Sequence, residues 1–537
     1  MTSLKAVRGT RDLLPPETAL WNRIEATARA VFARYNFGEI RTPVFEDTAL
    51  FARGVGEETD IVSKEMYTWS DRERFDKQAL RRSWETSYTH AWPRIEHLPH
   101  EKSDADMVFR DPDDGRVIFI SFVEKASTVT RQSLECIVNA DRQKCGTDNI
   151  YGLLVYPADA GPENVDVNDT TAIGEWPVRG NFFASRQSLT LRPENTAGVV
   201  RSYIENKLGE SGQLQKLYYI GPQFRRERPQ KGRYRQFSQI GAEVIGPPSS
   251  GSESPLRDAE VLEMLATLLD ELGITGWTLE LNSVGSAADR ARYNETLRAA
   301  LVPVVSQMCV DCQRRAVTNP LRVLDCKVPA DQPIIDTLPV IADSLDEASR
   351  AHFAQVLAAL DAAGVPYLRN QRLVRGLDYY TRTTFEFTHG GLGAQNALLG
   401  GGRYDGLSEA IGGPKAPGIG FAMGEDRLVL TLMALETAAR HEKAAAFIAP
   451  LGEGVNPAAL ALARELRRAG LRIELGEGGF RLKKSFEAAD KCARAIVILG
   501  EDELQSGILT VKTFATGMQT KVPRAELAVF LNQRTMV

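Results

Sequence analysis

A short arginine-rich connection between two strand-like runs is the feature that most constrains the fold of this 537-residue chain. The runs LQKLYYIG and SQIGAEVIG flank the segment Phe224–Gln239, FRRERPQKGRYRQFSQ. Pro229 and Gly232 suit a turn between antiparallel strands, so the two runs are predicted to pair as neighbours in an antiparallel sheet. The loop is either a solvated charged hairpin or a phosphate-binding site, because guanidinium forks bind phosphate oxygens bidentately.

The strand that follows this loop favours the second interpretation. Gln239 and Glu243 are four residues apart, and residues an even number apart in a strand face the same side. Both side chains are therefore expected to line one pocket beside the arginines. An acid and an amide next to a phosphate clamp fit a site for an amino acid together with ATP.

Three further segments carry candidate site residues, and the last two are weak signals alone. Leu373–Phe387, LVRGLDYYTRTTFEF, places Arg375 beside a glycine that frees the backbone. Residues 400–407, GGGRYDGL, permit close approach of backbone to a ligand. Residues 417–430, PGIGFAMGEDRLVL, predict a strand that runs into a helix carrying Arg427.

Composition limits the class of protein without identifying it. Apolar residues make up 43% and charged residues 25% of the chain, which is typical of a globular protein. No apolar run approaches the roughly 20 residues that span a membrane, and the N-terminus has no signal-peptide pattern, so we expect a cytoplasmic protein without membrane contact. The net charge of −5 argues against indiscriminate binding along DNA but allows a local basic groove.

The periodicity predicts helices and strands in several parts of the chain. Helices are expected at residues 18–36, 256–272 and 344–364, and Pro43 interrupts the strand-like run FGEIRTPVFED. Residues 71–184 contain their own strand-like runs, RVIFISFV and IYGLLVYP, and are predicted to be an inserted α/β module. The tail from residue 443 alternates strand and helix patterns, which indicates a small α/β domain.

Taken together, these segments resemble histidine–tRNA ligases, a family of class II aminoacyl-tRNA synthetases. RTPVFED, FRRERPQKGRYRQF and GIGFAMGEDRL resemble the three class II motifs, and LVRGLDYYTRTTFEF and GGGRYDGL resemble the two histidine-specific peptides. VRGTRDLLP and the RPENT turn belong to the same pattern. The resemblance implies an α+β catalytic core, an antiparallel sheet flanked by helices, together with an α/β anticodon-binding domain and an α/β insertion.

The implied domains are residues 1–70 with 185–438 for catalysis and 443–537 for anticodon binding. A helical family insertion is expected at about 286–366, and the 71–184 module has no readable function.

The resemblance also implies which residues hold the amino acid. Six positions match the family pattern: Glu194, Thr196, Gln239, Glu243, Tyr379 and Tyr380. The first three would hold the α-ammonium group, and the other three would read the imidazole ring. Such a pocket rejects other amino acids because they leave its buried polar groups unpaired.

The resemblance implies that ATP binds on the antiparallel sheet, as in class II folds, and in agreement the chain contains no Walker loop. By the matching positions, Arg225 would grip the α-phosphate, Arg233 the γ-phosphate, and Arg427 would stack on adenine, with Glu227 also in the ATP site. Arg375 is the expected catalytic residue together with Arg225. It would stabilise the charge that develops on the α-phosphate, while Mg²⁺ neutralises the departing diphosphate and no tightly bound cofactor is expected.

The implied reaction is the ATP-dependent ligation of L-histidine to histidine tRNA by a homodimer. Arg228 and Gln230 are expected to reach the acceptor end of the tRNA. Lys483 and Lys484, at the start of a predicted helix in the tail, would contact the RNA backbone, although a solvated helix end is an equal alternative.

Two rival functions remain open at this stage. A regulatory paralogue that senses histidine for ATP phosphoribosyltransferase would resemble the core, but it lacks the anticodon-binding tail and much of the arginine set. An active core diverted to another acceptor by the insertion is the second rival. Within the insertion, Asp106, Glu124 and Lys125 give a faint nuclease-like pattern with poor spacing, and a surface for RNA or assembly contacts is favoured.

The cysteines raise a separate question about a metal. Six in a chain of this length do not predict a disulfide scaffold. Cys309, Cys312 and Cys326 could supply three thiolates, but zinc requires a fourth ligand and no histidine lies nearby in sequence. The similar family segment carries serine at the cysteine positions, so no metal site is predicted, with zinc kept as the minor alternative.

Overall fold

The computed structural model describes two compact units. They are Met1–Asp12 with Ile24–Thr431, and Leu13–Arg23 with Leu432–Val537. The description leaves out residues 1–3, 57–58, 60, 73–80, 82–95, 98–105, 114, 123–149, 158–171, 174–175, 184–185, 230–231, 393–395, 436–442 and 534–537. Among the residues described, no helix combines the length and apolarity needed to cross a bilayer.

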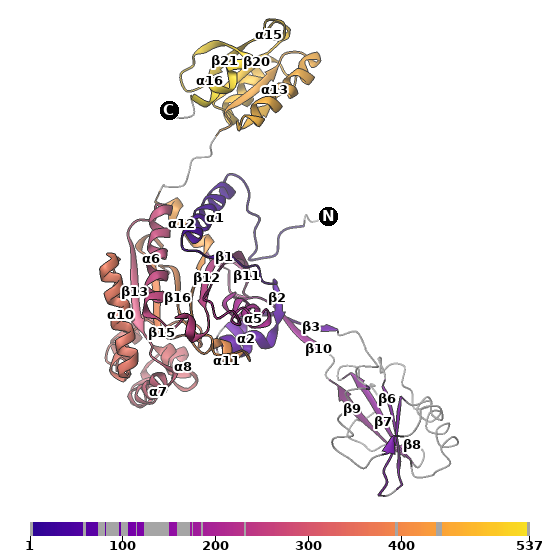
Figure 1. The fold of residues 1–537 in the computed structure, drawn as a ribbon, viewed down its shortest axis with the longest axis vertical. Helices are drawn as coiled ribbons and strands as arrows, with labels where there is room; N and C mark the ends of the chain where they lie inside the picture. The colour runs from indigo at the N-terminus through magenta and orange to yellow at the C-terminus, as the bar shows by residue number, and fades with distance from the viewer. Residues whose placement is uncertain are drawn as a thin grey trace. The chain divides into compact units, whose positions relative to one another are not determined.

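An eight-stranded sheet forms the centre of the first unit (Figure 1). Its order is β1-β11-β12-β17-β16-β15-β13-β14, and the pairing is antiparallel except at the two edge pairs β1–β11 and β13–β14. The strands are β1 (Gly38–Glu39), β11 (Gln215–Phe224), β12 (Gln236–Ile245), β13 (Trp277–Ser283), β14 (Leu368–Arg369), β15 (Thr381–His389), β16 (Ala397–Arg403) and β17 (Gly418–Gly424). The predicted hairpin at the arginine-rich loop is thus the β11–β12 pair, and the predicted α+β core with its antiparallel sheet is confirmed.

Helices cover this sheet and supply much of its buried surface. α6 (Pro255–Leu272) and α10 (Glu347–Ala363) pack on each other and on the sheet, and both match predicted helices. α1 (Glu17–Arg34) brings Phe32 to within 4.9 Å of the Tyr218 ring, centroid to centroid. The remaining helices are α2 (Thr48–Val55), α5 (Thr196–Glu205), α7 (Ala287–Leu301), α8 (Val310–Thr318), α9 (Gln332–Ile335), α11 (Leu407–Ala410) and α12 (Glu425–Ala434).

A small second sheet lies in the same unit, in the order β2-β10-β3. Its strands are β2 (Phe45–Asp47), β3 (Tyr67–Arg72) and β10 (Arg186–Leu191). Pro43 therefore separates β1 and β2, which belong to different sheets. Arg72 on β3 lies opposite Arg186 on β10, so the chain leaves and re-enters the core at neighbouring positions.

The stretch between these two strands contributes a six-stranded sheet in the order β4-β5-β6-β7-β9-β8. The strands are β4 (Glu96–His97), β5 (Met107–Arg110), β6 (Val117–Phe122), β7 (Ile150–Pro157), β8 (Ala172–Ile173) and β9 (Trp176–Phe183). β6 and β7 are the two predicted strand runs, and they pair in parallel. Asp106 accepts a hydrogen bond from the Phe122 amide at 2.7 Å, whereas Glu124 and Lys125 lie outside the described residues.

The second unit has the strand and helix alternation that the tail predicts. Its sheet has the order β19-β18-β20-β21-β22, formed by β18 (Ala446–Pro450), β19 (Ile473–Leu475), β20 (Ala495–Leu499), β21 (Ile508–Thr513) and β22 (Gln519–Pro523). Its helices include α13 (Asn456–Arg468), α14 (Leu482–Cys492), α15 (Glu501–Ser506) and α16 (Leu527–Gln533).

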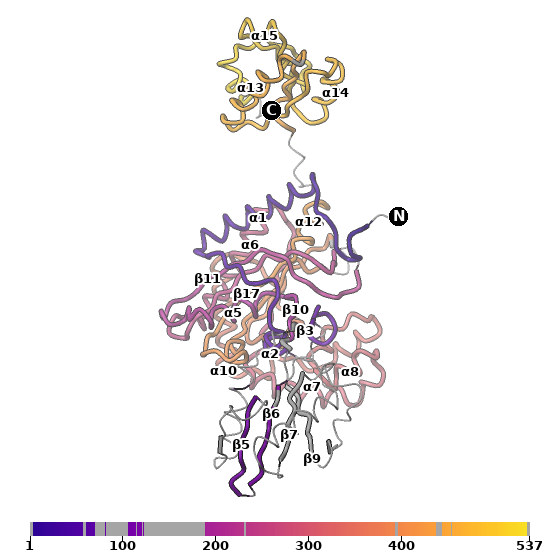
Figure 2. The backbone as a smooth tube through the Cα atoms, turned by 90° about the vertical axis from the view of Figure 1, so that its right-hand side faces the viewer, coloured from indigo at the N-terminus to yellow at the C-terminus, as the bar shows by residue number. Residues whose placement is uncertain are grey.

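Alternate residues of β18 face two separate apolar clusters in this unit. Ala446 and Ile448 pack with residues of α13, whereas Phe447 and Ala449 pack with residues of α14. Because neighbouring residues of a strand face opposite sides, α13 and α14 cover opposite faces of the sheet. Figure 2 shows these two helices on opposite sides of the unit.

Candidate active site

Strand β12 carries two buried polar side chains on the central sheet. Gln239 is 8% exposed and Glu243 is fully buried, as the even spacing predicts. Glu243 lies opposite Gly420 of β17, and a Cβ atom at Gly420 would be 1.7 Å from Glu243 Oε2. The glycine of the predicted strand in residues 417–430 is therefore required beside this carboxylate.

The RPENT turn joins this strand through a chain of short hydrogen bonds. Glu194 accepts from the amides of Thr196 at 2.7 Å and Ala197 at 3.1 Å, which caps the first turn of α5. Thr196 Oγ1 donates to Glu243 Oε1 at 2.7 Å. The structure thus brings Glu194, Thr196 and Glu243 together, although they come from two separate segments.

Burial sets the electrostatics of these carboxyl groups. It raises the pKa of Glu194, and it raises the pKa of Glu243 to about 8, where the nearby Glu194 charge adds to the effect. Among the described residues, no hydrogen bond of ordinary geometry reaches the buried atoms Glu243 Oε2 and Gln239 Oε1, although the Tyr404 hydroxyl lies close enough to Glu243 to act on its carboxyl group. Such acceptors cost free energy unless a ligand satisfies them, so they mark a site for a group with polar hydrogens.

Arg375 reaches the same region from the loop before β15. Its Nη1 forms an ion pair with Glu386 Oε1 at 2.5 Å. A Cβ atom at Gly400 of β16 would lie 2.5 Å from Cζ and from both Nη atoms of Arg375. The guanidinium therefore lies against the bare backbone of the GGGRYDGL segment, which explains why a glycine stands there. After Glu386, Tyr380 also contributes to raising the pKa of Arg375, so its phenol lies near the guanidinium group.

The two tyrosines of the same loop lie next to each other. The ring centroids of Tyr379 and Tyr380 are 4.7 Å apart, and Tyr380 is 9% exposed. Burial raises the pKa of both phenols, so they stay protonated and can donate hydrogen bonds. The charges of Glu194 and Glu243 add to the rise, which places both rings near the buried carboxyl groups.

Three of the predicted ATP-site arginines also lie near one another. Arg225 donates from Nε to the Pro193 carbonyl at 2.8 Å. Arg233 Nη1 lies 3.2 Å from Glu227 Oε2. Burial lowers the pKa of Arg427, and the positive charges of Arg233 and Arg225 lower it further. The hairpin and α12 therefore contribute their guanidinium groups to one positively charged region.

The structure describes three of the four residues predicted to contact tRNA. Arg228 is exposed on the hairpin, and Gln230 lies outside the described residues. Lys483 and Lys484 are exposed in the first turn of α14, within the second unit. Lys484 Nζ lies 3.8 Å from the centroid of the Phe480 ring.

The sequence did not reveal that the N-terminal segment supports the hairpin. Arg235 donates its backbone N–H to the Gly9 carbonyl at 2.7 Å. Arg11 pairs with Asp426 of α12 at 3.0 Å and lies over the Tyr234 ring at 4.8 Å. The VRGTRDLLP segment thus links the arginine-rich loop to the helix of residues 417–430. In the sequence, only the resemblance of VRGTRDLLP to the family pattern pointed to this segment.

Arg403 of the GGGRYDGL segment has a structural position. It is fully buried and pairs with Asp258 at 2.6 Å and Asp405 at 2.8 Å. Asp258 also contacts His352 at 2.9 Å. This buried network fixes α6 and α10 against the end of β16.

Comparison with known proteins identifies the family. Two family models match, one described as histidyl-tRNA synthetase over residues 183–428 and one described as an anticodon binding domain over residues 445–534. A histidine–tRNA ligase of Koribacter versatilis is 57% identical over 529 residues, covering 98% of this chain and 96% of that protein. A histidine–tRNA ligase of Solibacter usitatus is 45% identical, with coverage of 98% and 99%.

Solved structures agree with these matches. The crystal structure of apo S. aureus histidyl-tRNA synthetase superimposes with a TM-score of 0.64 and 31% identity, covering 98% of this chain and all of that one. A Bacillus halodurans structure titled as an ATP phosphoribosyltransferase regulatory subunit/histidyl-tRNA synthetase has a TM-score of 0.52 at 16% identity, covers 93% of this chain and 99% of that one, and shares the fold. The chain belongs to the histidine–tRNA ligase family.

Proposed function

We propose that this chain ligates L-histidine to histidine tRNA in two steps, using ATP. The observation that carries the proposal is the buried, hydrogen-bonded set Glu194, Thr196 and Glu243. Glu243 belongs to β12, whose hairpin with β11 also carries Arg225 and Arg233. Two relatives that cover nearly the whole chain bear the name histidine–tRNA ligase.

The amino-acid pocket is built from groups that need a polar partner. Glu194, Thr196 and Gln239 bind the α-ammonium group of histidine, and Glu243 accepts from an imidazole N–H. Tyr379 and Tyr380 complete the ring pocket. An amino acid without an imidazole leaves the Oε2 atom of Glu243 without the N–H donor that histidine supplies, which costs about 1–3 kcal/mol.

The phosphate side uses the arginines in separate roles. The histidine carboxylate attacks the α-phosphorus of ATP, the bond to the β-phosphate oxygen breaks, and diphosphate leaves. Arg225 and Arg375 stabilise the charge on the α-phosphate oxygens, and Arg233, near Glu227, holds the γ-phosphate. Arg427 covers the adenine ring.

Mg²⁺ would enter bound to ATP, since this ion is usually coordinated by substrate phosphates and water together with only one or two protein carboxylates. In the second step a terminal ribose hydroxyl of the tRNA attacks the carbonyl carbon of histidyl-adenylate, and AMP leaves.

The tRNA is held through the hairpin and the second unit. Arg228 and Gln230 contact the acceptor end, and Lys483 and Lys484 contact the backbone near the anticodon. The match of residues 445–534 to an anticodon binding domain supports the second placement. We also propose the domain division of residues 1–70 with 185–438, 71–184, and 443–537. A variant with Lys483→Glu and Lys484→Glu should lose tRNA charging while retaining histidine activation.

We further propose that the enzyme acts as a homodimer in the cytoplasm. Phe45 of β2 and Trp69 of β3 are 53% and 41% exposed, and their ring centroids are 6.1 Å apart. Exposed aromatic pairs of this kind suit an interface between copies. Sedimentation of the purified chain should give a dimer, and Phe45→Glu should shift it towards monomer. A monomeric unmodified chain would contradict the proposal.

One pair of assays tests the function and separates its rivals. Exchange of labelled diphosphate into ATP should depend on histidine, and histidine tRNA should then be charged. A regulatory paralogue would give neither signal. An enzyme diverted to another acceptor would give exchange without charging, and either result would overturn the proposed function.

A further inference from the structure

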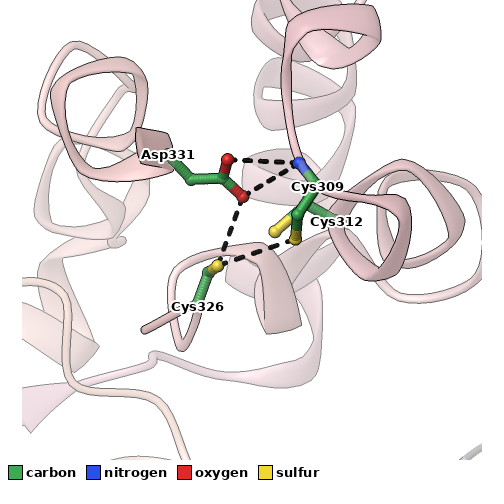
Figure 3. A group of neighbouring side chains, drawn as sticks. All are labelled: Cys309, Cys312, Cys326 and Asp331. Carbon is green, nitrogen blue, oxygen red and sulfur yellow. Dashed lines mark hydrogen bonds between the residues drawn. The ribbon is translucent and has the colours of Figure 1, made fainter. Parts of the chain in front are cut away.

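Four side chains with metal-binding atoms converge in the helical region between β13 and β14. Figure 3 shows Cys309, Cys312, Cys326 and Asp331 pointing toward one another. Their ligand atoms all lie within 4.8 Å of each other. The sequence prediction of no metal rested partly on the lack of a fourth ligand, and Asp331 occupies that place.

Two of the six ligand-to-ligand distances match the edges of a tetrahedral zinc site, and all six are within 4.8 Å. With Zn–S bonds of about 2.3 Å and a Zn–O bond of about 2.0 Å, tetrahedral angles give S···S of about 3.8 Å and S···O of about 3.5 Å. Cys309 Sγ and Cys326 Sγ are 3.9 Å apart, and Cys326 Sγ is 3.3 Å from Asp331 Oδ2. A disulfide would require about 2.05 Å between two sulfurs and would leave the third thiol and the carboxylate without a role.

Local structure also prepares this cluster for anionic ligands. Cys309 is the N-cap residue of α8, and Cys312 lies in the first turn, where the helix dipole opposes the rise in pKa that burial gives the Cys312 thiol. The Cys309 amide donates to both oxygens of Asp331, at 3.1 and 3.2 Å. The Val328 amide donates to Cys326 Sγ at 3.4 Å. Outer hydrogen bonds of this kind orient the ligands of metal sites.

We propose that Cys309, Cys312, Cys326 and Asp331 bind one Zn²⁺ ion as a closed structural site. Three soft thiolates favour zinc over Mg²⁺ or Ca²⁺. Four protein ligands leave no open position for catalysis. The ion would be shielded from solvent, because Cys312, Cys326 and Asp331 are at most 5% exposed. A carboxylate buried this deeply costs free energy unless hydrogen bonds and a positive charge offset its lost hydration.

The bound ion positions a part of the proposed active site. Arg322, in the segment between Cys312 and Cys326, donates from Nη1 to the Arg375 carbonyl at 3.2 Å. Asn319, in the same segment, donates to Asp378 Oδ1 at 2.9 Å. Zinc therefore fixes the segment that holds the LVRGLDYY loop, a consequence that rests on the proposed function.

The test measures metal directly and so is independent of enzymatic activity. The full chain, purified without a metal-binding tag, should contain about one zinc per chain by mass spectrometry. Replacement by Co²⁺ should give thiolate-to-cobalt charge-transfer bands and the visible bands of a tetrahedral ion. Cys312→Ser should lose both signals, Asp331→Asn should weaken zinc affinity at least tenfold against a chromophoric chelator, and Cys492→Ser should match the unmodified chain.

Removal of zinc should lower the Tm and raise the KM for histidine, and restoring zinc should reverse both. Three results would overturn the site: no zinc in the unmodified chain and no thiolate band on adding Co²⁺, full zinc in a folded Cys312→Ser variant, or a disulfide within the cluster after reduction and purification in a reducing buffer. A zinc-loaded chain without histidine activation would refute the proposed function and leave the metal site intact.

Discussion

The contact between Gly400 and Arg375 gives a sharp prediction about catalysis. An alanine Cβ at position 400 would lie 2.5 Å from three atoms of the guanidinium group. Carbon atoms in contact lie 3.5–4.0 Å apart, so the guanidinium must move by about 1 Å. The Arg375 side chain is 22% exposed and has several rotatable bonds, so it can move without unfolding the core. The loss should therefore appear in catalysis and hardly in stability.

We expect Gly400→Ala to reduce histidine-dependent diphosphate exchange by about 100-fold, or about 2.7 kcal/mol of transition-state stabilisation. Its folding stability should fall by no more than about 1 kcal/mol, the usual value of a partly exposed ion pair such as Arg375 with Glu386. Gly38→Ala is the matched control, because Gly38 is in the same sheet and a Cβ there meets nothing within 4 Å.

A double-mutant cycle decides whether the loss acts through Arg375. Arg375→Ala should largely abolish histidyl-adenylate formation while the chain stays folded. Adding Gly400→Ala to that variant should cost little more, since the displaced group is already gone. Near-normal exchange in Gly400→Ala, or losses that simply add in the double variant, would refute the electrostatic role assigned to this guanidinium.

Three other predictions concern the core and the insertion. Burial raises the pKa of Glu243 from 4.5 to about 8, so the free energy of unfolding should fall as pH rises from 5 to 8, by at most about 5 kcal/mol. In urea titrations, Glu243→Gln should flatten this pH dependence, and an unchanged slope would contradict the prediction. Asp258→Ala leaves Arg403 with one fewer buried partner and should cost about 3–5 kcal/mol by urea denaturation, whereas a loss under about 1 kcal/mol would refute the pairing. Because Arg72 lies opposite Arg186, replacing residues 73–185 by Asn-Gly should close a two-residue hairpin and preserve diphosphate exchange, and an insoluble product would show that the insertion is structurally integrated.

Local patterns predicted much of the fold. Helical periodicity identified α6 and α10, and strand spacing placed Gln239 and Glu243 in one buried row. Turn residues predicted the β11–β12 hairpin. These signals succeed because they depend on residues close together in sequence, where backbone geometry decides which side chains share a face.

Long-range contacts could not be predicted in the same way. The sequence indicates only that Gly400 allows close approach of the backbone to another group. That this group is Arg375 depends on how the loop before β15 packs against β16. Asp331 cannot be recognised as a ligand from the sequence, because a carboxylate five residues from Cys326 has no distinctive sequence signal. The roles assigned to the site residues remain predictions that the experiments above can test.

The N-terminal segment has a practical consequence for anyone who produces this enzyme. Gly9 and Arg11 hold the arginine-rich loop and α12 through contacts within the first dozen residues. Shortening the chain past Gly9 and Arg11 would remove these supports of the arginine-rich loop, although the loop lies far away in the sequence. Recombinant material for kinetic measurements should therefore keep residues 4–12 intact.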